Sequence, residues 1–300
     1  MRRVFVYEYL SDGGAADGKT DAEMLRAGQA MRDAIVSDLL ALPGLMTTRA
    51  VRPRSGEPTN SFVQRMAALH DHAWIVAPET GGVLAQLHEA VGPARWIGCS
   101  APAIRTASSK RATLAALSAR GVPTPLDLAD THAGAWVVKP DDGAGAVETC
   151  VHPDLSSARA DLQRRVDAGR SATLEPWVDG DALSMSLLAG AASVEAVAFN
   201  RQDVVVGTDG TLAWRGVRHG AIDPRRDARA PRLHALAAAV AQAVPGLRGY
   251  VGIDLVWHPQ RGPVVIEINP RVTCAYVGLS QALRRNLAGA VLALHAGGAG

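Results

Sequence analysis

Cysteine, lysine and aromatic residues are scarce in this chain of 300 residues, and long apolar runs are absent. The three cysteines, Cys99, Cys150 and Cys274, lie far apart in the sequence, so they predict neither a disulfide framework nor a zinc site. No apolar stretch reaches the ~18 residues of a membrane-spanning helix, so we expect no membrane association. The formal net charge of +2 gives no electrostatic reason to expect nucleic acid as a partner.

The shortage of lysine makes the lysines that are present informative. Among 31 basic residues only Lys19, Lys110 and Lys139 are lysines. Arginine can replace lysine on most solvated surfaces, so a lysine in such a chain indicates a position where a compact point charge is needed.

The first hundred residues alternate between strand and helix patterns. This alternation predicts a parallel sheet, in which glycine-rich turns at the strand ends bind ligands. The opening residues, MRRVFVYEYL, lack a long apolar core and a cleavage site of small residues, so we interpret them as a strand and expect a cytoplasmic protein. The expected strands are 4–10, 73–77 and 95–99, and the expected helices are 21–42 and 83–91.

The rest of the chain has an α+β pattern in which strands follow one another without intervening helices. A hydrophobic content of 48% suits two or three small domains, which we place at 1–103, 104–174 and 175–300. The expected helices are 108–119, 154–168 and 231–243, and the expected strands are 136–139, 173–178, an antiparallel set across 183–210, 250–258 and 263–269.

The segment VVIEINPRVT, residues 264–273, puts a carboxylate and a carboxamide on one face of an apolar strand. Glu267 and Asn269 point the same way because strand side chains alternate, and without partners their burial would be costly. A short turn predicts a hairpin with the strand YVGIDLVW, in which Asp254 lies opposite Glu267. The three oxygen-bearing side chains would suit Mg²⁺. Alternatively, the two carboxylates are solvated on an open sheet face.

Two further segments carry binding signals that are weak when taken alone. WVVKPDDGAGAVE delivers Lys139 at a strand end and continues into a loop with Gly143 and Gly145, which could turn its N–H groups onto phosphates. The alternative is a lysine before an ordinary turn. TLEPWVDGD carries Glu175 and Val178, which could read an adenine through a carboxylate and a backbone edge. The alternative is a surface glutamate before proline.

Together these features resemble the ATP-grasp superfamily over about residues 100–275. The resemblance implies an ATP-grasp fold of mixed α/β and α+β class. In it, a Rossmann-like pre-ATP-grasp domain precedes two subdomains that clamp ATP. A closer similarity is to the ATP-grasp group that contains tyramine–L-glutamate ligase. It is carried by the segments VFVYEYLSDGG, WIVAPETGGVL, NRQ at 200–202 and NPRVTCAYVGLS.

The resemblance implies an ATP-dependent carboxylate–amine ligase that forms an amide through an acyl phosphate. The substrates would be L-glutamate and an aromatic amine or amino acid, tyramine or tyrosine, in methanofuran or methylofuran biosynthesis. The cofactors would be ATP and Mg²⁺, which Mn²⁺ can replace. Relatives are often dimers, so a homodimer is an open expectation.

The resemblance also assigns roles to individual residues. Arg271 would bind the acyl phosphate or a substrate carboxylate, and Arg215 and Arg218 are further candidates or else a solvated pair. Relatives often bind ribose through an acidic residue seven positions after the adenine-reading glutamate. Ala182 stands there, so Asp181 is the candidate replacement. The remaining assignments are Asp254, Glu267 and Asn269 for Mg²⁺, Lys110 and Lys139 for the phosphates and purine, Gly143 and Gly145 for the loop over the phosphates, and Glu175 and Val178 for adenine.

Other functions remain open at this point. The chain could be an ATP-grasp ligase for a different dipeptide or cofactor amide, or a non-catalytic nucleotide-binding scaffold. The intact Asp254, Glu267 and Asn269 set argues against a scaffold. Glu79 follows a strand of the first domain, and Glu8 with the loop 11–14 lies at the same end of the first strand. They could touch ATP or substrate, or else cap a helix or form an ordinary turn.

Overall fold

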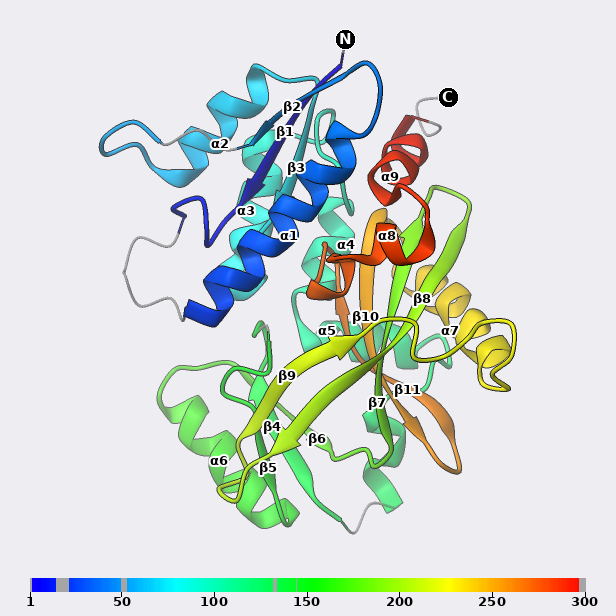
Figure 1. Ribbon diagram of the computed structural model, residues 1–300. Helices are drawn as coiled ribbons and strands as arrows, with labels where there is room; N and C mark the ends of the chain where they lie inside the picture. Colours follow the sequence, from blue (N-terminus) through cyan, green and yellow to red (C-terminus); the bar gives the residue numbers. More distant parts are fainter. Residues whose placement is uncertain (1, 15–21, 50–52, 132–133, 144, 297–300) are drawn as a thin grey trace.

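The computed structural model describes residues 2–14, 22–49, 53–131, 134–143 and 145–296. In this part of the chain three sheets are stacked along the molecule, and the C-terminal helices return to lie beside the first domain (Figure 1). None of the described helices is long and apolar enough to cross a membrane.

The first sheet is parallel, as predicted, with the strand order β2-β1-β3. Alternate side chains of the central strand enter two different cores. Val4 and Val6 pack with helix α1, whereas Phe5 and Tyr7 pack with helices α2 and α3. The elements are β1 (Arg2–Glu8), α1 (Ala22–Leu40), β2 (Leu45–Arg49), α2 (Thr59–Ala68), β3 (His72–Val76), the 3-10 turn η1 (Thr80–Gly82) and α3 (Val83–Val91).

The end of this domain differs from the prediction. The expected strand at 95–99 is wrong, because only Trp96 pairs, in a single bridge with Ala73. Gly98 has φ +146°, which takes the chain out of strand geometry directly afterwards. The expected helix at 108–119 is α5 (Lys110–Ser118), and a separate helix α4 (Ala101–Ala107) precedes it. Ser100 and Ser109 cap the two helices, each accepting a hydrogen bond from a backbone N–H.

The middle sheet is small and antiparallel, with the order β5-β4-β6. Trp136 and Val138 pack under helix α6 on one face, so the opposite face of β4 presents Val137 and Lys139. The elements are the 3-10 helix η2 (Pro125–Thr131), β4 (Trp136–Pro140), β5 (Cys150–His152), α6 (Leu155–Asp167) and β6 (Ala172–Pro176).

The third sheet has five antiparallel strands in the order β11-β10-β7-β8-β9. The hairpin of β10 and β11 has the predicted register, with Asp254 opposite Glu267. The elements are β7 (Asp181–Ala189), β8 (Val194–Val206), β9 (Leu212–Arg218), α7 (Ala230–Ala243), β10 (Gly249–His258), β11 (Gly262–Asn269), the 3-10 turn η3 (Cys274–Tyr276), α8 (Leu279–Leu283) and α9 (Leu287–Ala296).

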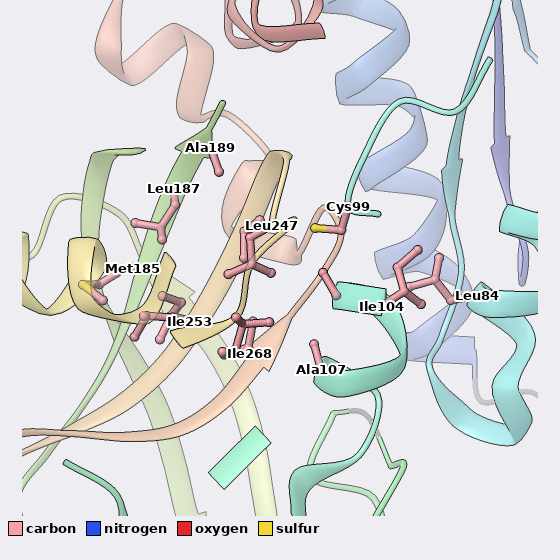
Figure 2. Close-up of a cluster of buried hydrophobic side chains, with 14 of the residues drawn as sticks. Leu84, Cys99, Ile104, Ala107, Met185, Leu187, Ala189, Leu247, Ile253 and Ile268 are labelled. Carbon is pink, nitrogen blue, oxygen red and sulfur yellow. The ribbon is translucent and has the colours of Figure 1, made fainter. Parts of the chain in front are cut away.

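The first domain and the third sheet share one hydrophobic core. Leu84 and Ile104 lie on one side of this core, and Leu187, Ile253 and Ile268 lie on the other (Figure 2). Because apolar side chains from both parts are buried together, the core fixes the first domain against the sheet that carries the Asp254–Glu267 hairpin.

The turn between β8 and β9 reaches the middle sheet. The N–H of Val151 donates to the carbonyl of Gly210 at 2.8 Å, and the N–H of Leu212 donates to the carbonyl of Thr149 at 2.9 Å. Gly210 has φ +83°, and a Cβ there would lie 2.4 Å from the Val151 carbonyl oxygen, so this close approach requires glycine. The β8–β9 hairpin therefore spans from the third sheet to the middle sheet.

Candidate functional site

A cavity of about 540 Å³ lies where the three parts of the fold meet. The first domain contributes the ends of β1 and β3 and one face of α1. The middle sheet contributes β4, β6 and the loop between β4 and β5, and the third sheet contributes residues of all five strands. All the residues predicted to bind Mg²⁺, the purine and the phosphates line this cavity, namely Lys110, Lys139, Gly143, Gly145, Glu175, Val178, Asp254, Glu267 and Asn269.

The hairpin end of the cavity gathers oxygen-bearing side chains. Asn269 Nδ2 donates to Asp254 Oδ2 at 3.0 Å, and Gln202 Nε2 donates to Asp254 Oδ1. Glu267 faces Asp254 across the hairpin, and Lys110 Nζ lies 3.4 Å from Glu267 Oε1. Burial, together with the facing charge of Glu267, raises the pKa of Asp254 to about 7. The two carboxylates therefore repel each other unless a cation lies between them.

The residues at this end fit a magnesium ion. Within the described residues, no group of three or more His, Cys, Asp or Glu side chains could hold a metal by itself. The hairpin offers two carboxylates and one amide oxygen. Mg²⁺ is usually bound in proteins by only one or two carboxylates together with substrate phosphates and water. The donor set therefore suits a Mg²⁺ ion that arrives with a nucleotide.

The loop between β4 and β5 is held at both ends. At its start, Asp141 accepts hydrogen bonds from Ser109 Oγ at 2.8 Å and from the N–H of Arg111 at 2.9 Å, which ties the loop to the beginning of α5. At its end, Arg165 Nη1 donates to the carbonyl of Glu148 at 2.8 Å. Between these points Lys110 Nζ donates to the carbonyl of Gly143 at 2.5 Å.

The far end of this phosphate loop, residues 141–149, has an unusual backbone. Gly145, Ala146 and Glu148 have φ values of +69°, +63° and +54°. Left-handed residues close together in a loop can turn successive N–H groups toward one point, which forms a concave site for an anion. The loop geometry is therefore compatible with the predicted contact to phosphates.

The middle sheet contributes one buried ion pair to the cavity wall. Lys139 Nζ lies 2.8 Å from Glu175 Oε2, and Thr173 Oγ1 donates to Glu175 Oε1 at 3.0 Å. Both charged side chains are almost fully buried. Val178 and further apolar residues complete the wall, and these are Pro125, Val137, Leu255, Val256 and Ile266. A flat aromatic base that offers donors and acceptors at its rim suits such a slot.

Arg271 lies beside the hairpin and lines the cavity. Its Nη2 donates to Glu79 Oε2 at 2.8 Å, and its Nη1 donates to the carbonyl of Val272 at 3.2 Å. The guanidinium is thus fixed between the first domain and the end of β11.

Three predicted residues are not brought to the cavity. Asp181 pairs with Arg201 at 2.9 Å and with Arg229 at 3.1 Å, while its neighbour Ala182 is the one that lines the cavity. Arg215 and Arg218 are exposed on β9, whose cavity-lining residues include Trp214 and Val217.

Two residues of the site carried little or no weight in the sequence prediction. Gln202 donates a hydrogen bond to Asp254 and lines the cavity. It could have been found from the sequence because it lies two residues after the buried Asn200 and therefore on the same face of the strand. Glu8 is 2% exposed and lines the cavity at the end of β1. Burial raises its pKa, whereas a hydrogen bond from the N–H of Ser11 at 2.7 Å opposes that shift. A Cβ on Gly28 would lie 2.4 Å from its carboxylate, so α1 approaches Glu8 closely.

The family assignment agrees with this geometry. Residues 107–275 match the model of an ATP-grasp domain, and residues 30–104 match the model of a pre ATP-grasp domain. The chain belongs to the ATP-grasp family. Its fold is accordingly an ATP-grasp fold behind an N-terminal pre-ATP-grasp domain. A solved ATP-grasp superfamily protein from Archaeoglobus fulgidus is 21% identical. It superposes with a TM-score of 0.72 over 98% of this chain and 88% of that one.

Two curated relatives match part of this chain in sequence. The tyramine–L-glutamate ligases of Methanocaldococcus jannaschii and Methanocaldococcus fervens are 28% and 26% identical over 211 residues, which is 70% of this chain. The match covers 58% and 61% of the two relatives, so the chain spans about three fifths of their length.

Proposed function

We propose that this ATP-grasp protein is an ATP-dependent carboxylate–amine ligase that joins L-glutamate to tyramine or tyrosine. The observation that carries the proposal is the facing pair of Asp254 and Glu267, with Lys110 3.4 Å from Glu267, in a cavity that the buried Lys139–Glu175 pair also lines. Two lysines and the hairpin carboxylates in one cavity suit a Mg²⁺-bound nucleoside triphosphate.

The proposed reaction begins with the nucleotide. Adenine would lie against Val178 and the Lys139–Glu175 pair, and the phosphates would extend past Lys110 and the phosphate loop toward the hairpin. Asp254, Glu267 and Asn269 would hold Mg²⁺, which would neutralise charge on the phosphate oxygens. Lys110 and Arg271 contribute fixed positive charge at the place where two anions, a carboxylate and the γ-phosphate, have to meet.

Amide formation then takes two steps. A glutamate carboxylate oxygen attacks the γ-phosphorus, ADP leaves, and an acyl phosphate forms. The amine nitrogen attacks the acyl carbon, the C–O bond to phosphate breaks, and the nitrogen loses a proton. Arg271 lies next to the hairpin, where it would bind the acyl phosphate during both steps.

The acceptor side of the cavity supports an aromatic amine. The first domain lines it with Leu10, Met24, Ala27 and Met31, and two acidic residues, Glu8 and Glu23, lie among these apolar ones. Met24, Ala27 and Met31 follow each other at helical spacing on one face of α1. An apolar wall with buried carboxylate fits an aromatic ring that carries an ammonium group.

The names of the two relatives, tyramine–L-glutamate ligases, support L-glutamate and tyramine as the substrates. A place in methanofuran- or methylofuran-type cofactor biosynthesis is part of the same proposal. The proposal includes two further points: Mn²⁺ can replace Mg²⁺, and the protein forms a homodimer.

The test is ADP release with Mg·ATP, L-glutamate and a panel of amines that includes tyramine, tyrosine, phenethylamine and alkylamines, with the product mass recorded. The expected result is ADP release only when glutamate and one aromatic amine are both present, with a product lighter than the sum of the two substrates by one water. A different carboxylate donor would point to another ATP-grasp ligase. Tight nucleotide binding without turnover across a wide donor and acceptor panel would point to a nucleotide-binding scaffold and would contradict the proposal.

A further inference from the structure

A single turn of the first domain contacts two separate parts of the candidate active site, Arg271 and the phosphate loop. The turn is Pro78–Gly82, with the sequence PETGG, two residues after the end of β3. Gly81 and Gly82 have φ values of +63° and +70°, so two successive residues adopt the left-handed conformation that other residues avoid. This backbone aims Glu79 and the N–H of Gly81 away from the first domain.

The first contact is with the arginine beside the hairpin. Glu79 Oε2 accepts from Arg271 Nη2 at 2.8 Å, across 192 positions of sequence. Glu79 is 4% exposed, and its Oε1 and Arg271 Nε are buried atoms without a hydrogen-bond partner among the described residues. Of the two hydrogen bonds that hold the guanidinium, the one to Glu79 is the shorter and joins it to a carboxylate, while the other goes to the Val272 carbonyl at 3.2 Å. The orientation of this charge therefore depends mainly on Glu79.

The second contact is with the phosphate loop. Thr80 Oγ1 donates to the carbonyl of Asp142 at 3.1 Å, and the N–H of Gly81 donates to Asp142 Oδ2 at 2.9 Å. The next residue, Gly143, receives the bond from Lys110 Nζ. The loop is therefore held from the first domain on one side and from α5 on the other, at the residues that lead into its glycines.

We propose that the 78–82 turn is a positioning element for the reaction. Glu79 orients Arg271 toward the acyl phosphate, and Thr80 with Gly81 holds Asp142 at the start of the phosphate loop, beside the Gly143 carbonyl that accepts from Lys110. This inference rests on the proposed ligase function for its kinetic consequence, but not for its geometry. The two contacts act on different steps, because Arg271 meets the transferred phosphoryl group whereas the loop meets bound ATP.

The kinetic test separates the two contacts. Glu79→Ala is expected to lower kcat by about 10- to 100-fold with KM for ATP within about twofold, since a small displacement of a positioned group costs about that much. Glu79→Gln keeps an acceptor oxygen and is expected to recover part of the loss. Asp142→Ala is expected to raise KM for ATP several-fold with a smaller effect on kcat. The matched control is Glu195→Ala, which removes an exposed pair with Arg285 and should change neither constant.

Two measurements without turnover keep the test independent of the proposed function. In nitrogen-15 spectra of the arginine side chains, the Arg271 guanidinium, assigned with Arg271→Lys, should rotate slowly in the wild-type protein and faster in Glu79→Ala. In hydrogen exchange with Mg·ATP, amides of the phosphate loop should lose protection in Asp142→Ala but not in Glu195→Ala.

The outcomes are distinct. No turnover by the wild-type protein with any substrate pair would overturn the ligase proposal, while the spectra and exchange would still decide the positioning role. An unchanged Arg271 signal and loop protection would overturn the positioning role. The positioning role would also be overturned if kcat and KM changed in parallel and only in proportion to the loss of unfolding free energy. If Glu79→Ala does not fold, the same measurements are made on Glu79→Gln.

Discussion

Asp254 and Glu267 face each other across the β10–β11 hairpin, and both carboxylates line one cavity. Desolvation of Asp254, and then the facing charge of Glu267, raise the pKa of Asp254 to about 7. Both carboxylates are half-buried, so their repulsion raises the free energy of the fold unless a cation compensates it. Lys110 supplies one positive charge at 3.4 Å from Glu267. The same pair of carboxylates that repel each other therefore favours binding of a cation at the hairpin.

Glu267→Gln is expected to lower ATP turnover by at least about 100-fold with little change in stability. The substitution keeps the side-chain size and removes the repulsion with Asp254, but it also removes the ion pair with Lys110 at 3.4 Å, so the two effects on the urea midpoint should largely cancel. ADP release and urea unfolding at pH 7 measure the two effects. Glu195→Gln, on the exposed part of β8, is the control for the chemical change itself. Normal turnover by a folded Glu267→Gln protein would contradict the metal assignment.

Substitutions in the buried Lys139–Glu175 pair should change the free energy of unfolding as well as the affinity for ATP. Lys139→Met and Glu175→Gln should each destabilise the fold by about 3 kcal/mol, because each leaves one buried charge without its partner. The double variant should lose much less than the sum, since it removes both charges.

Nucleotide affinity separates the structural role of this pair from its binding role. Calorimetric titration with ATP should show weakened binding in the double variant even though its fold is nearly as stable as the wild type. Unchanged ATP affinity in the folded double variant would contradict the assignment of both residues to the nucleotide.

The hairpin could be predicted from sequence because its signals are local. Alternation and a short turn fix which side chains share a face, and the observed register pairs Asp254 with Glu267 as expected. The same alternation explains Asp181. It and Ala182 point to opposite faces of β7, so only one of them can reach the cavity.

Other parts of the site depend on long-range contacts that no periodicity reports. The Glu79–Arg271 pair joins residues 192 positions apart. The register between β8 and β9 shifts at Asp203 and Val204 of β8, which leaves Arg215 of β9 without a partner, and this bulge decides which residues of β9 face the cavity. Val217 pairs with the cavity-lining Gln202, so its neighbour Arg218 lies on the outer face. The short strand β2 was missed because its five residues are only half buried and do not alternate clearly.

The end of the phosphate loop depends on a buried charge cluster in α6. Arg165 donates to the Glu148 carbonyl and also pairs with Asp161 at 3.1 Å, and Asp161 accepts from His152 at 3.0 Å. Burial alone would raise the pKa of Asp161, but the bonds from Arg165 and His152 outweigh it, so the net shift is downward. A lowered folded pKa stabilises the protein at neutral pH, and this contribution is lost as pH falls through that pKa.

Asp161→Asn is expected to destabilise the protein by about 3 kcal/mol at pH 7, because buried Arg165 loses its counter-charge. The difference from wild type should shrink as the pH is lowered into the acid range, where Asp161 is protonated in both states of the wild-type protein. Urea unfolding between pH 7 and pH 3 measures this, and KM for ATP should rise because the Glu148 anchor loosens. Asp167→Asn, at the exposed last residue of α6, is the control and should change neither quantity. A difference that stays constant with pH would rule out the charge interaction as its cause.

Because Ala182 stands at the position where relatives often place an acidic ribose ligand, we expect the protein to discriminate only weakly between ribose and 2′-deoxyribose in the nucleotide. Ala182 lines the cavity, while the carboxylate of Asp181 is engaged with Arg201 and Arg229. A methyl group cannot accept a hydrogen bond from the ribose hydroxyls, so 2′-deoxy-ATP should support turnover with kcat/KM within about threefold of ATP. A hydrogen bond to a charged group contributes about 1.5–3 kcal/mol, so Ala182→Asp should raise the preference for ATP by about 10-fold or more. Asp181→Asn should leave the ratio unchanged. A strong preference for ATP that Asp181→Asn removes would instead place the Asp181 carboxylate on the ribose, which would require β7 to turn its first residue into the cavity when nucleotide binds.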